Sequence, residues 1–196
     1  MSKKILAHIA IFSANLIYGI NYTVAKDVMP NYIEPLGFIF LRVSGASILF
    51  WVFFYFFFFE KVEKKDLIRL AFCGLFGVAI NQILFFEGLN LTTPINAAVI
   101  MVINPILVIL IGSFLTVEVL TSKKIFGVVL GAIGAIILIT YGSSQIINLE
   151  HLKGNIMILI NATSYAMYLV LAKPLMKKYK PITVISWVFF FGFIYV

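Results

Sequence analysis

Charged side chains stand inside long apolar stretches of this sequence, where they could bind a small charged molecule. Arg42 lies seven residues into one such stretch, and a guanidinium binds a carboxylate through two parallel hydrogen bonds. Glu87, near the end of the next stretch, could serve as the counter-ion of Arg42 or as a proton-coupling site. The alternative is that Arg42 extends toward lipid headgroups while Glu87 is solvated. Because buried charge is costly, we favour a paired or functional role for Arg42.

Polar residues also recur at helical spacing in two of the stretches. At about 100° per residue, one line on the first stretch holds His8, Asn15, Gly19, Tyr22 and Lys26, and one on the sixth holds Asn161, Ser164, Tyr165 and Tyr168. Such stripes face a polar cavity or hydrogen-bond to other helices. Taking the cavity reading, the candidate substrate-binding residues are Asn15, Tyr18, Tyr22, Arg42, Asn81, Asn104, Tyr165 and Tyr168.

Catalytic and metal-binding patterns do not occur in the sequence. Cys73 is the single cysteine, which excludes an internal disulfide, and His8 and His151 are far apart. No paired acids, activated nucleophile or metal-ligand cluster stands within the apolar stretches. We therefore predict a protein that is not an enzyme and that uses neither a metal nor a cofactor.

The elements that must position these residues are membrane-spanning helices. Six uncharged or nearly uncharged stretches cover 5–25, 35–59, 67–89, 95–117, 125–142 and 154–172, and a seventh opens at Pro181. A bilayer core about 30 Å thick needs about 20 apolar residues in a helix, and these stretches lack the alternation of barrel strands. The composition is 62% hydrophobic and only 12% charged, with a mean hydropathy of +1.08. An all-α polytopic membrane protein is predicted, and a soluble enzyme or nucleic-acid binder is excluded.

Basic residues alternate in number between successive connections. Twelve lie before the first stretch or in every second connection, whereas the remaining connections hold only Lys26 and Lys153. Since cytoplasmic loops are enriched in Lys and Arg, we expect the N terminus in the cytoplasm and the protein in the cytoplasmic (inner) membrane. The net charge of +7 is thus a topology signal and does not indicate a nucleic-acid partner.

The sixth stretch repeats features of the first. With a shift of 147 residues, Tyr18, Ala25-Lys26, Met29 and Tyr32 match Tyr165, Ala172-Lys173, Met176 and Tyr179. Five helices separate the two copies, and an odd number inverts the second copy in the membrane. Inverted repeats with a substrate site between them are typical of secondary transporters. We expect one complete five-helix repeat over 1–147 and an incomplete second repeat over 148–196.

Several of these features together resemble the drug/metabolite transporter superfamily, EamA type. They are a short polar loop before the fourth stretch (Thr92 to Asn96), Asn104-Pro105 within it, Glu118 at its end, a glycine-rich fifth stretch, and Pro35 followed by Arg42. The resemblance implies ten helices in two inverted repeats, with both termini cytoplasmic, and export or exchange of amino acids and other small metabolites. The chain departs from that pattern by about three helices, and we expect it to be a C-terminal truncation of a longer transporter.

Small residues and prolines indicate how the helices pack and bend. Gly74, Gly77, Asn81 and Gly88 form one small-residue face, and Gly127, Gly131 and Gly134 another, which allows close helix approach. Pro105 removes a backbone hydrogen bond in the fourth stretch and is the predicted hinge. The expected partners are the bilayer, a small metabolite and, as an open alternative, a second copy in a homodimer. A non-transporting scaffold or a channel subunit remains the alternative function.

Overall fold

The computed structural model describes residues 3–115, 121–123, 125–127, 129–131, 133–134 and 149–196. Helices account for most of these residues, and no strand occurs in these ranges. The helices are α1 (Lys3–Val28), α2 (Pro35–Phe57), α3 (Lys64–Gly74), the π-helical turn η1 (Leu75–Ala79), α4 (Ile80–Leu91), α5 (Pro94–Met101), α6 (Asn104–Leu115), α8 (Leu149–Lys178) and α9 (Pro181–Tyr195).

Five continuous helical segments in the described residues are long and apolar enough to cross a membrane. They cover Lys4–Val28, Pro35–Phe57, Lys64–Leu91, Pro94–Leu115 and His151–Lys178, and the shorter apolar helix Pro181–Tyr195 follows them. The predicted all-α polytopic class is confirmed. The predicted span over 125–142 lies partly outside the described residues. Glu118 and the predicted repeat boundary between 147 and 148 lie wholly outside them.

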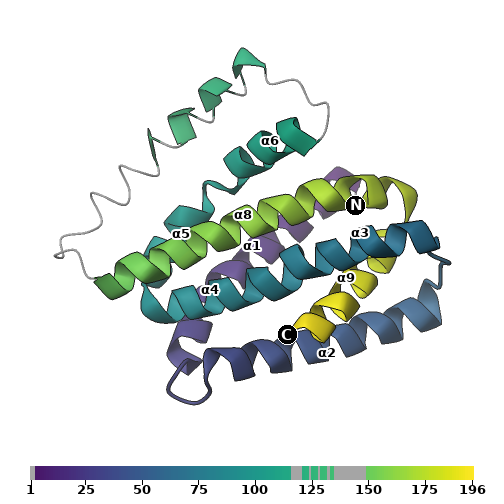
Figure 1. Ribbon diagram of the computed structural model, residues 1–196, viewed down its shortest axis with the longest axis horizontal. Helices are drawn as coiled ribbons and strands as arrows, with labels where there is room; N and C mark the ends of the chain where they lie inside the picture. The colour runs from purple at the N-terminus through teal and green to yellow at the C-terminus, as the bar shows by residue number, and fades with distance from the viewer. Residues whose placement is uncertain (1–2, 116–120, 124, 128, 132, 135–148) are drawn as a thin grey trace.

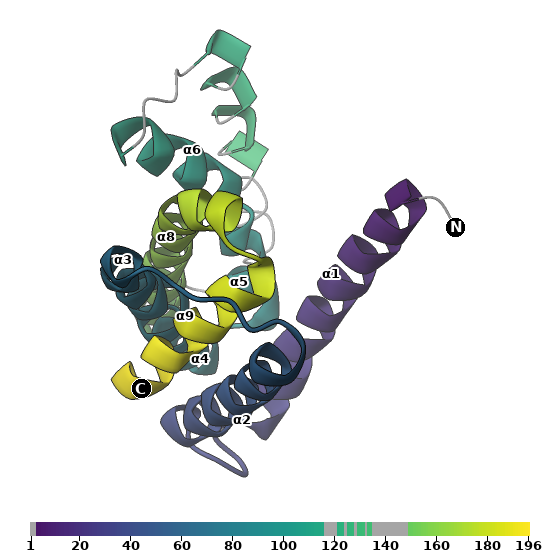
Figure 2. The ribbon, with the colours of Figure 1, turned by 90° about the vertical axis from the view of Figure 1, so that its right-hand side faces the viewer.

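Helix α8 forms the centre of the helix packing. It lies beside α3 and α4 along their length and also contacts α5 and α6 (Figure 1). Helix α9 packs between α2 and α3. Helix α1 leaves this bundle at an angle, so that its N-terminal half stands apart (Figure 2). The most apolar window of α1 is 0% buried, and α1 contacts the bundle mainly through α4 and α5 near its C-terminal end.

Glycines allow a close helix crossing between α4 and α8. A Cβ added at Gly88 would lie 2.9 Å from the carbonyl oxygen of Gly154, and a Cβ added at Gly154 would lie 2.7 Å from that of Gly88. Only glycine fits at both positions without a backbone shift. The predicted small-residue face over 74–88 therefore packs tightly, but not against one neighbour: Gly74 meets α9, whereas Gly88 meets α8.

Two irregular turns interrupt the membrane helices. The π-helical turn η1 separates α3 from α4, and residues 102–103 separate α5 from α6. The second break precedes Pro105, which lacks an N–H and cannot bond to the carbonyl of Met101. Val102 and Ile103 instead bond to carbonyls three residues back. The predicted kink is thus a break between two helices, with Pro105 at the second position of α6.

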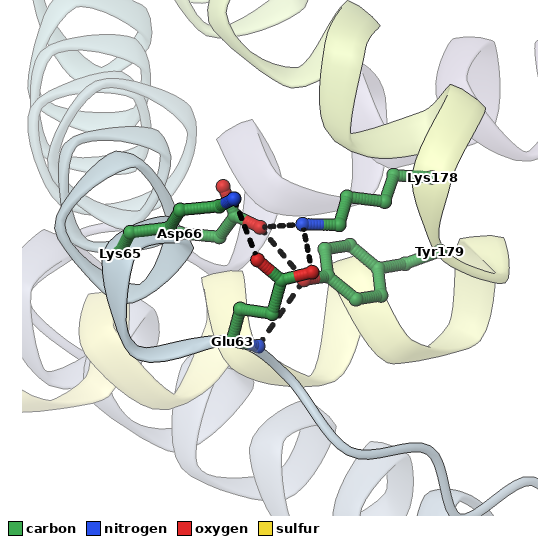
Figure 3. Close-up of polar contacts among 5 residues, drawn as sticks. All are labelled: Glu63, Lys65, Asp66, Lys178 and Tyr179. Atoms are coloured by element: carbon green, nitrogen blue, oxygen red, sulfur yellow. Dashed lines mark hydrogen bonds and ion pairs between the residues drawn. The ribbon is translucent and has the colours of Figure 1, made fainter.

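Acidic and basic side chains join two connections at the end of the bundle where α3 begins and α8 ends (Figure 3). Lys178 Nζ lies 2.7 Å from Asp66 Oδ2 and 2.6 Å from Glu63 Oε1. The Tyr179 hydroxyl donates to Asp66 Oδ2 at 2.7 Å and accepts from the Glu63 N–H at 3.2 Å. Glu63 also pairs with Lys65 at 2.8 Å. We call these five residues the end cluster.

A third acidic residue, Glu60, extends the link between the two connections. Glu60 Oε2 accepts hydrogen bonds from the Thr183 hydroxyl at 2.6 Å and from the Lys180 N–H at 3.0 Å. These bonds, the Thr183 bond above all, hold the pKa of Glu60 below its usual range. The bonds from Lys178 and Lys65 do the same for the pKa of Glu63. Both carboxylates are therefore charged at neutral pH and keep the α2–α3 connection on the start of α9.

Candidate functional site

A cavity of about 430 Å³ opens in the middle of the bundle, among α1, α2, α4, α8 and the break between α5 and α6. Its volume lies in the range of small-molecule sites. Its walls combine amides, hydroxyls and rings with a single arginine. The lining residues are Asn15, Tyr18, Gly19, Asn21, Tyr22, Arg42, Asn81, Gln82, Phe85, Phe86, Met101, Asn104, Asn161 and Tyr165.

Seven of the eight residues expected from the sequence to bind substrate line this cavity. They are Asn15, Tyr18, Tyr22, Arg42, Asn81, Asn104 and Tyr165. The eighth, Tyr168, packs elsewhere: a Cβ added at Gly77 would lie 2.6 Å from its ring, which places the ring against η1. Its ring centroid lies 5.8 Å from that of Tyr165, so Tyr168 supports a wall residue from behind.

Arg42 supplies the positive charge of the cavity. Its Nη1 donates a 2.6 Å hydrogen bond to Asn21 Oδ1 on α1. Its guanidinium carbon lies 5.4 Å from the centroid of the Phe38 ring and 5.0 Å from that of Phe86, distances at which a cation is attracted to an aromatic face. One donor group of the fork is used by Asn21, so the remaining N–H groups can receive an anion.

The two other singled-out residues lie outside the cavity lining. Within the described residues Glu87 forms no ion pair with Arg42, and Asn21 is the partner of Arg42 in its place. Pro105 follows Asn104, whose side chain does line the cavity. The helix break at 102–103 thereby brings Met101 and Asn104 to the wall, although Pro105 itself does not reach it.

Three amide oxygens in the cavity wall are buried without a hydrogen-bond partner. They belong to Gln82 on α4, Asn104 on α6 and Asn161 on α8. The Asn161 amide is held by its other end, because Nδ2 donates to the Asn81 carbonyl at 2.7 Å. A buried acceptor left unpaired costs about 1–3 kcal/mol, so these oxygens favour a ligand that brings N–H donors. The wall thus offers a guanidinium for an anion and oxygens for a cation or an amine.

Aromatic rings separate and enclose these polar groups. Tyr22 packs edge-on against Phe85 with ring centroids 5.1 Å apart, and Phe85 packs against Phe86 at 4.9 Å. Helix α1 is anchored nearby, since Lys26 Nζ donates to the carbonyls of Leu89 at 3.0 Å and Asn90 at 2.6 Å. These contacts place the Tyr22 side of α1 against α4, where it can close one wall of the cavity.

Five further wall residues belong neither to the eight sequence-based candidates nor to the two polar stripes, which already held Gly19 and Asn161. They are Asn21, Gln82, Phe85, Phe86 and Met101. Asn21 and Gln82 are polar residues inside apolar stretches, and that signal alone could have found them. The rings and Met101 are ordinary apolar membrane residues, and nothing in the sequence distinguishes them. Within the described residues, no group of three His, Cys, Asp or Glu side chains could hold a metal ion.

Comparison with known proteins identifies transporters as relatives. The EamA-like transporter family matches residues 5–140. The chain is 24% identical over 193 residues to "Uncharacterized transporter YyaM" of Bacillus subtilis, covering 97% of this chain and 63% of that protein. It is 26% identical over 191 residues to an "Uncharacterized transporter" of Methanothermobacter thermautotrophicus, covering 90% of this chain and 55% of that protein.

A third relative gives the same picture. "Uncharacterized transporter YetK" of Bacillus subtilis is 24% identical over 199 residues, covering 100% of this chain and 60% of that protein. The chain therefore spans about three-fifths of the length of these curated relatives. No solved structure matches the chain.

Proposed function

The chain belongs to the EamA-like transporter family, and on that premise we propose that it carries an amino acid, or another small metabolite with both a carboxylate and an amine, across the cytoplasmic membrane. We propose export or exchange as the mode, in an inverted-repeat fold with the N terminus in the cytoplasm. The substrate would bind in the cavity, and the eight candidate residues other than Tyr168 would contact it.

The observation that carries this proposal is that one part of the cavity wall offers a positively charged donor, whereas another part offers unpaired acceptor oxygens. Arg42 projects into the cavity from α2, and its fork matches the two oxygens of a carboxylate. The unpaired oxygens of Gln82, Asn104 and Asn161 come from α4, α6 and α8 and match the N–H groups of an ammonium. A zwitterion would satisfy both at once, whereas an anion or an amine alone would leave one of them unpaired.

The placement of the end cluster supports an alternating-access mechanism. The cavity lies near the middle of the helices, and Arg42 is about 10 Å from the start of α2 at 1.5 Å per residue. The end cluster and Glu60 join the α2–α3 and α8–α9 connections at the opposite end of α2, which positive-inside counting assigns to the cytoplasm. We propose that these contacts close the cytoplasmic side and must separate when the cavity opens inward.

The proposal is tested with the full-length protein, purified and reconstituted in lipid vesicles. Counterflow of radiolabelled leucine should be measured beside that of isopentylamine, which lacks the carboxylate, and of 4-methylpentanoate, which lacks the ammonium. We expect a saturable signal for a zwitterion and at least about tenfold less for either matched compound, since each leaves a charged hydrogen bond unmade. Other amino acids should be tried in the same way, because the wall does not define the side chain.

Two outcomes would contradict the proposal. Equal transport of 4-methylpentanoate and leucine would remove the role of the three amide oxygens. Absence of saturable flux for every zwitterion, amine and acid, from protein shown to be inserted and folded, would favour the scaffold alternative.

A further inference from the structure

A second depression lies outside the cavity, along the first turns of α3 and beside α8. Its volume is about 430 Å³, and it is lined by Lys65, Asp66, Ile68, Arg69, Phe72 and Leu171. All but Leu171 of α8 belong to α3. Lys65 and Asp66 also belong to the end cluster, but none of the six residues lines the cavity proposed for the substrate.

Arg69 is the one guanidinium in this depression, and within the described part of the chain it forms neither a side-chain hydrogen bond nor an ion pair. The acidic residue nearest to it in the lining, Asp66, already accepts from Lys178 and Tyr179, both at 2.7 Å (Figure 3). The N–H groups of the Arg69 guanidinium are therefore available to a ligand. The only carboxylate of the lining, that of Asp66, is already paired with Lys178 of α8. An open guanidinium of this kind favours an anion with two oxygens to share.

The other walls of the depression are apolar and exposed. Ile68, between Lys65 and Arg69, is 67% exposed, and Phe72, which follows Arg69, is 50% exposed. Lys64 begins an apolar span, so Lys65 and Arg69 stand at headgroup depth, and Phe72 lies about one turn deeper, beside the acyl chains. From headgroup depth toward the bilayer centre, the lining thus changes from basic to apolar side chains. A phospholipid changes in the same order, from its charged headgroup to its acyl chains.

We propose that this depression is a binding site for the headgroup of an anionic phospholipid. The phosphate oxygens would pair with Arg69, Lys65 would add charge at the rim, and an acyl chain would lie along Ile68, Phe72 and Leu171. A free phosphate would use only the basic half of the lining, and the exposed side chains of Ile68 and Phe72 commit the site to a lipid. This inference needs only that the chain spans a membrane, and it stands apart from the proposed substrate.

Native mass spectrometry of the detergent-purified protein tests the site. Phosphatidylglycerol and phosphatidylcholine with the same acyl chains are titrated separately, and the first bound lipid is counted. Wild type should bind phosphatidylglycerol several-fold more tightly than phosphatidylcholine. Arg69→Gln should lower the phosphatidylglycerol affinity by about fivefold or more, since one basic residue near an anionic surface contributes a factor of that size.

The matched control is Lys64→Gln, which removes one charge from the same helix but from a residue outside the lining. We expect it to keep the preference for phosphatidylglycerol. An equal loss in both variants would overturn the site, because general attraction would explain it. Full competition by soluble glycerol 1-phosphate would also overturn it, since a free anion would then suffice.

A second variant keeps the test decisive if Arg69→Gln does not fold. Arg69→Lys retains the charge but cannot make two parallel bonds to phosphate. Its affinity ratio between the two lipids should fall below that of wild type, and an unchanged ratio would overturn a role for the guanidinium fork.

Discussion

The guanidinium of Arg42 on α2 bonds to the amide oxygen of Asn21 on α1 at 2.6 Å, across the cavity that both residues line. This contact is one of few that hold α1, because the helix is otherwise exposed along much of its length. A carboxylate that pairs with the remaining N–H groups of Arg42 would share the guanidinium with Asn21 and pull it away from the Asn21 oxygen. Binding of substrate would then change how α1 is held, which links occupancy of the cavity to movement of a helix.

Arg42 should be required for transport but not for insertion. Arg42→Leu should lower the transport rate of a zwitterion by at least about tenfold, because a charge-assisted hydrogen bond contributes about 1.5–3 kcal/mol. Arg42→Lys should restore little, since an ammonium is a point charge without the fork. Vesicle uptake measures both variants, and Lys64→Gln is the control outside the cavity. Wild-type uptake by Arg42→Leu would make the residue a lipid anchor.

The unpaired side-chain oxygen of Gln82 should accept a hydrogen bond from the amine of the substrate. Gln82→Leu keeps the approximate size but removes the acceptor, so the KM for the amino acid should rise by about tenfold while that for the matched carboxylic acid stays constant. Uptake kinetics with both compounds measure the split. Asn31→Leu, at an asparagine that does not line the cavity, should change neither value. A parallel rise for both compounds would show that the substitution only distorts the wall.

The crossing of α4 and α8 should be intolerant of a single methyl group. Gly154→Ala places a Cβ 2.7 Å from the carbonyl oxygen of Gly88 and should cost about 1–3 kcal/mol of the free energy of unfolding. Gly45→Ala is the matched control, because a Cβ there meets nothing within 4 Å. Thermal unfolding in detergent compares the two. Equal thermal unfolding midpoints for the two variants would mean that α4 and α8 accommodate the added methyl group without loss of stability.

The link formed by Glu60 should weaken in acid. Its hydrogen bond from Thr183 lowers the pKa in the folded protein, so the unfolded state binds more protons and stability rises with pH. The stabilisation is complete above the ordinary pKa of Glu, about 4.3, and is lost as the pH falls through the lower folded value. Glu60→Gln should therefore be less stable than wild type at pH 7, and the difference should shrink below about pH 4. A difference independent of pH would contradict this.

The proposed orientation can be measured by cysteine labelling in intact cells. In a Cys73→Ala background, Lys61→Cys and Lys177→Cys should be shielded from an impermeant thiol reagent, and Asn31→Cys should react. The lysine distribution is the reason, since basic connections remain in the cytoplasm. Labelling of Lys61→Cys from outside would reverse the orientation and the assignment of the end cluster to the cytoplasmic side.

The sequence predicted the helices and most of the cavity because both depend on local composition. Lengths and hydropathy define the spans, and Asn15, Tyr22 and Tyr165 are polar residues that lipid disfavours. Helical phase was a less reliable guide. The face over 74–88 was drawn on a regular helix, but the π-helical turn Leu75–Ala79 lies inside it and changes the direction of every later side chain. Gln82 lines the cavity beside Asn81, although only Asn81 was on the predicted face.

Pairing between distant residues was beyond the sequence. Glu87 was the counter-ion that the sequence suggested for Arg42, yet the structure pairs Arg42 with Asn21. The end cluster joins residues that are 112 positions apart, as with Asp66 and Lys178, and only the packing of α3 on α8 and α9 brings them together. Tyr168 shared a stripe with Tyr165 but turns toward Gly77, because the absence of a side chain there leaves room for its ring.

The mutual contact of Gly88 and Gly154 also bears on how the protein is made. Helix α8 leaves the ribosome only after α5, α6 and the stretch up to residue 148, and synthesis proceeds at about 5–20 residues per second. For several seconds α4 therefore waits in the bilayer with its glycine surface and the Asn81 carbonyl uncovered. During that interval α4 could associate with another membrane helix that has small side chains on its surface. Biogenesis should thus depend on an insertase or chaperone that shields α4 until α8 arrives, and slowing translation between the two helices should increase degradation of the nascent chain.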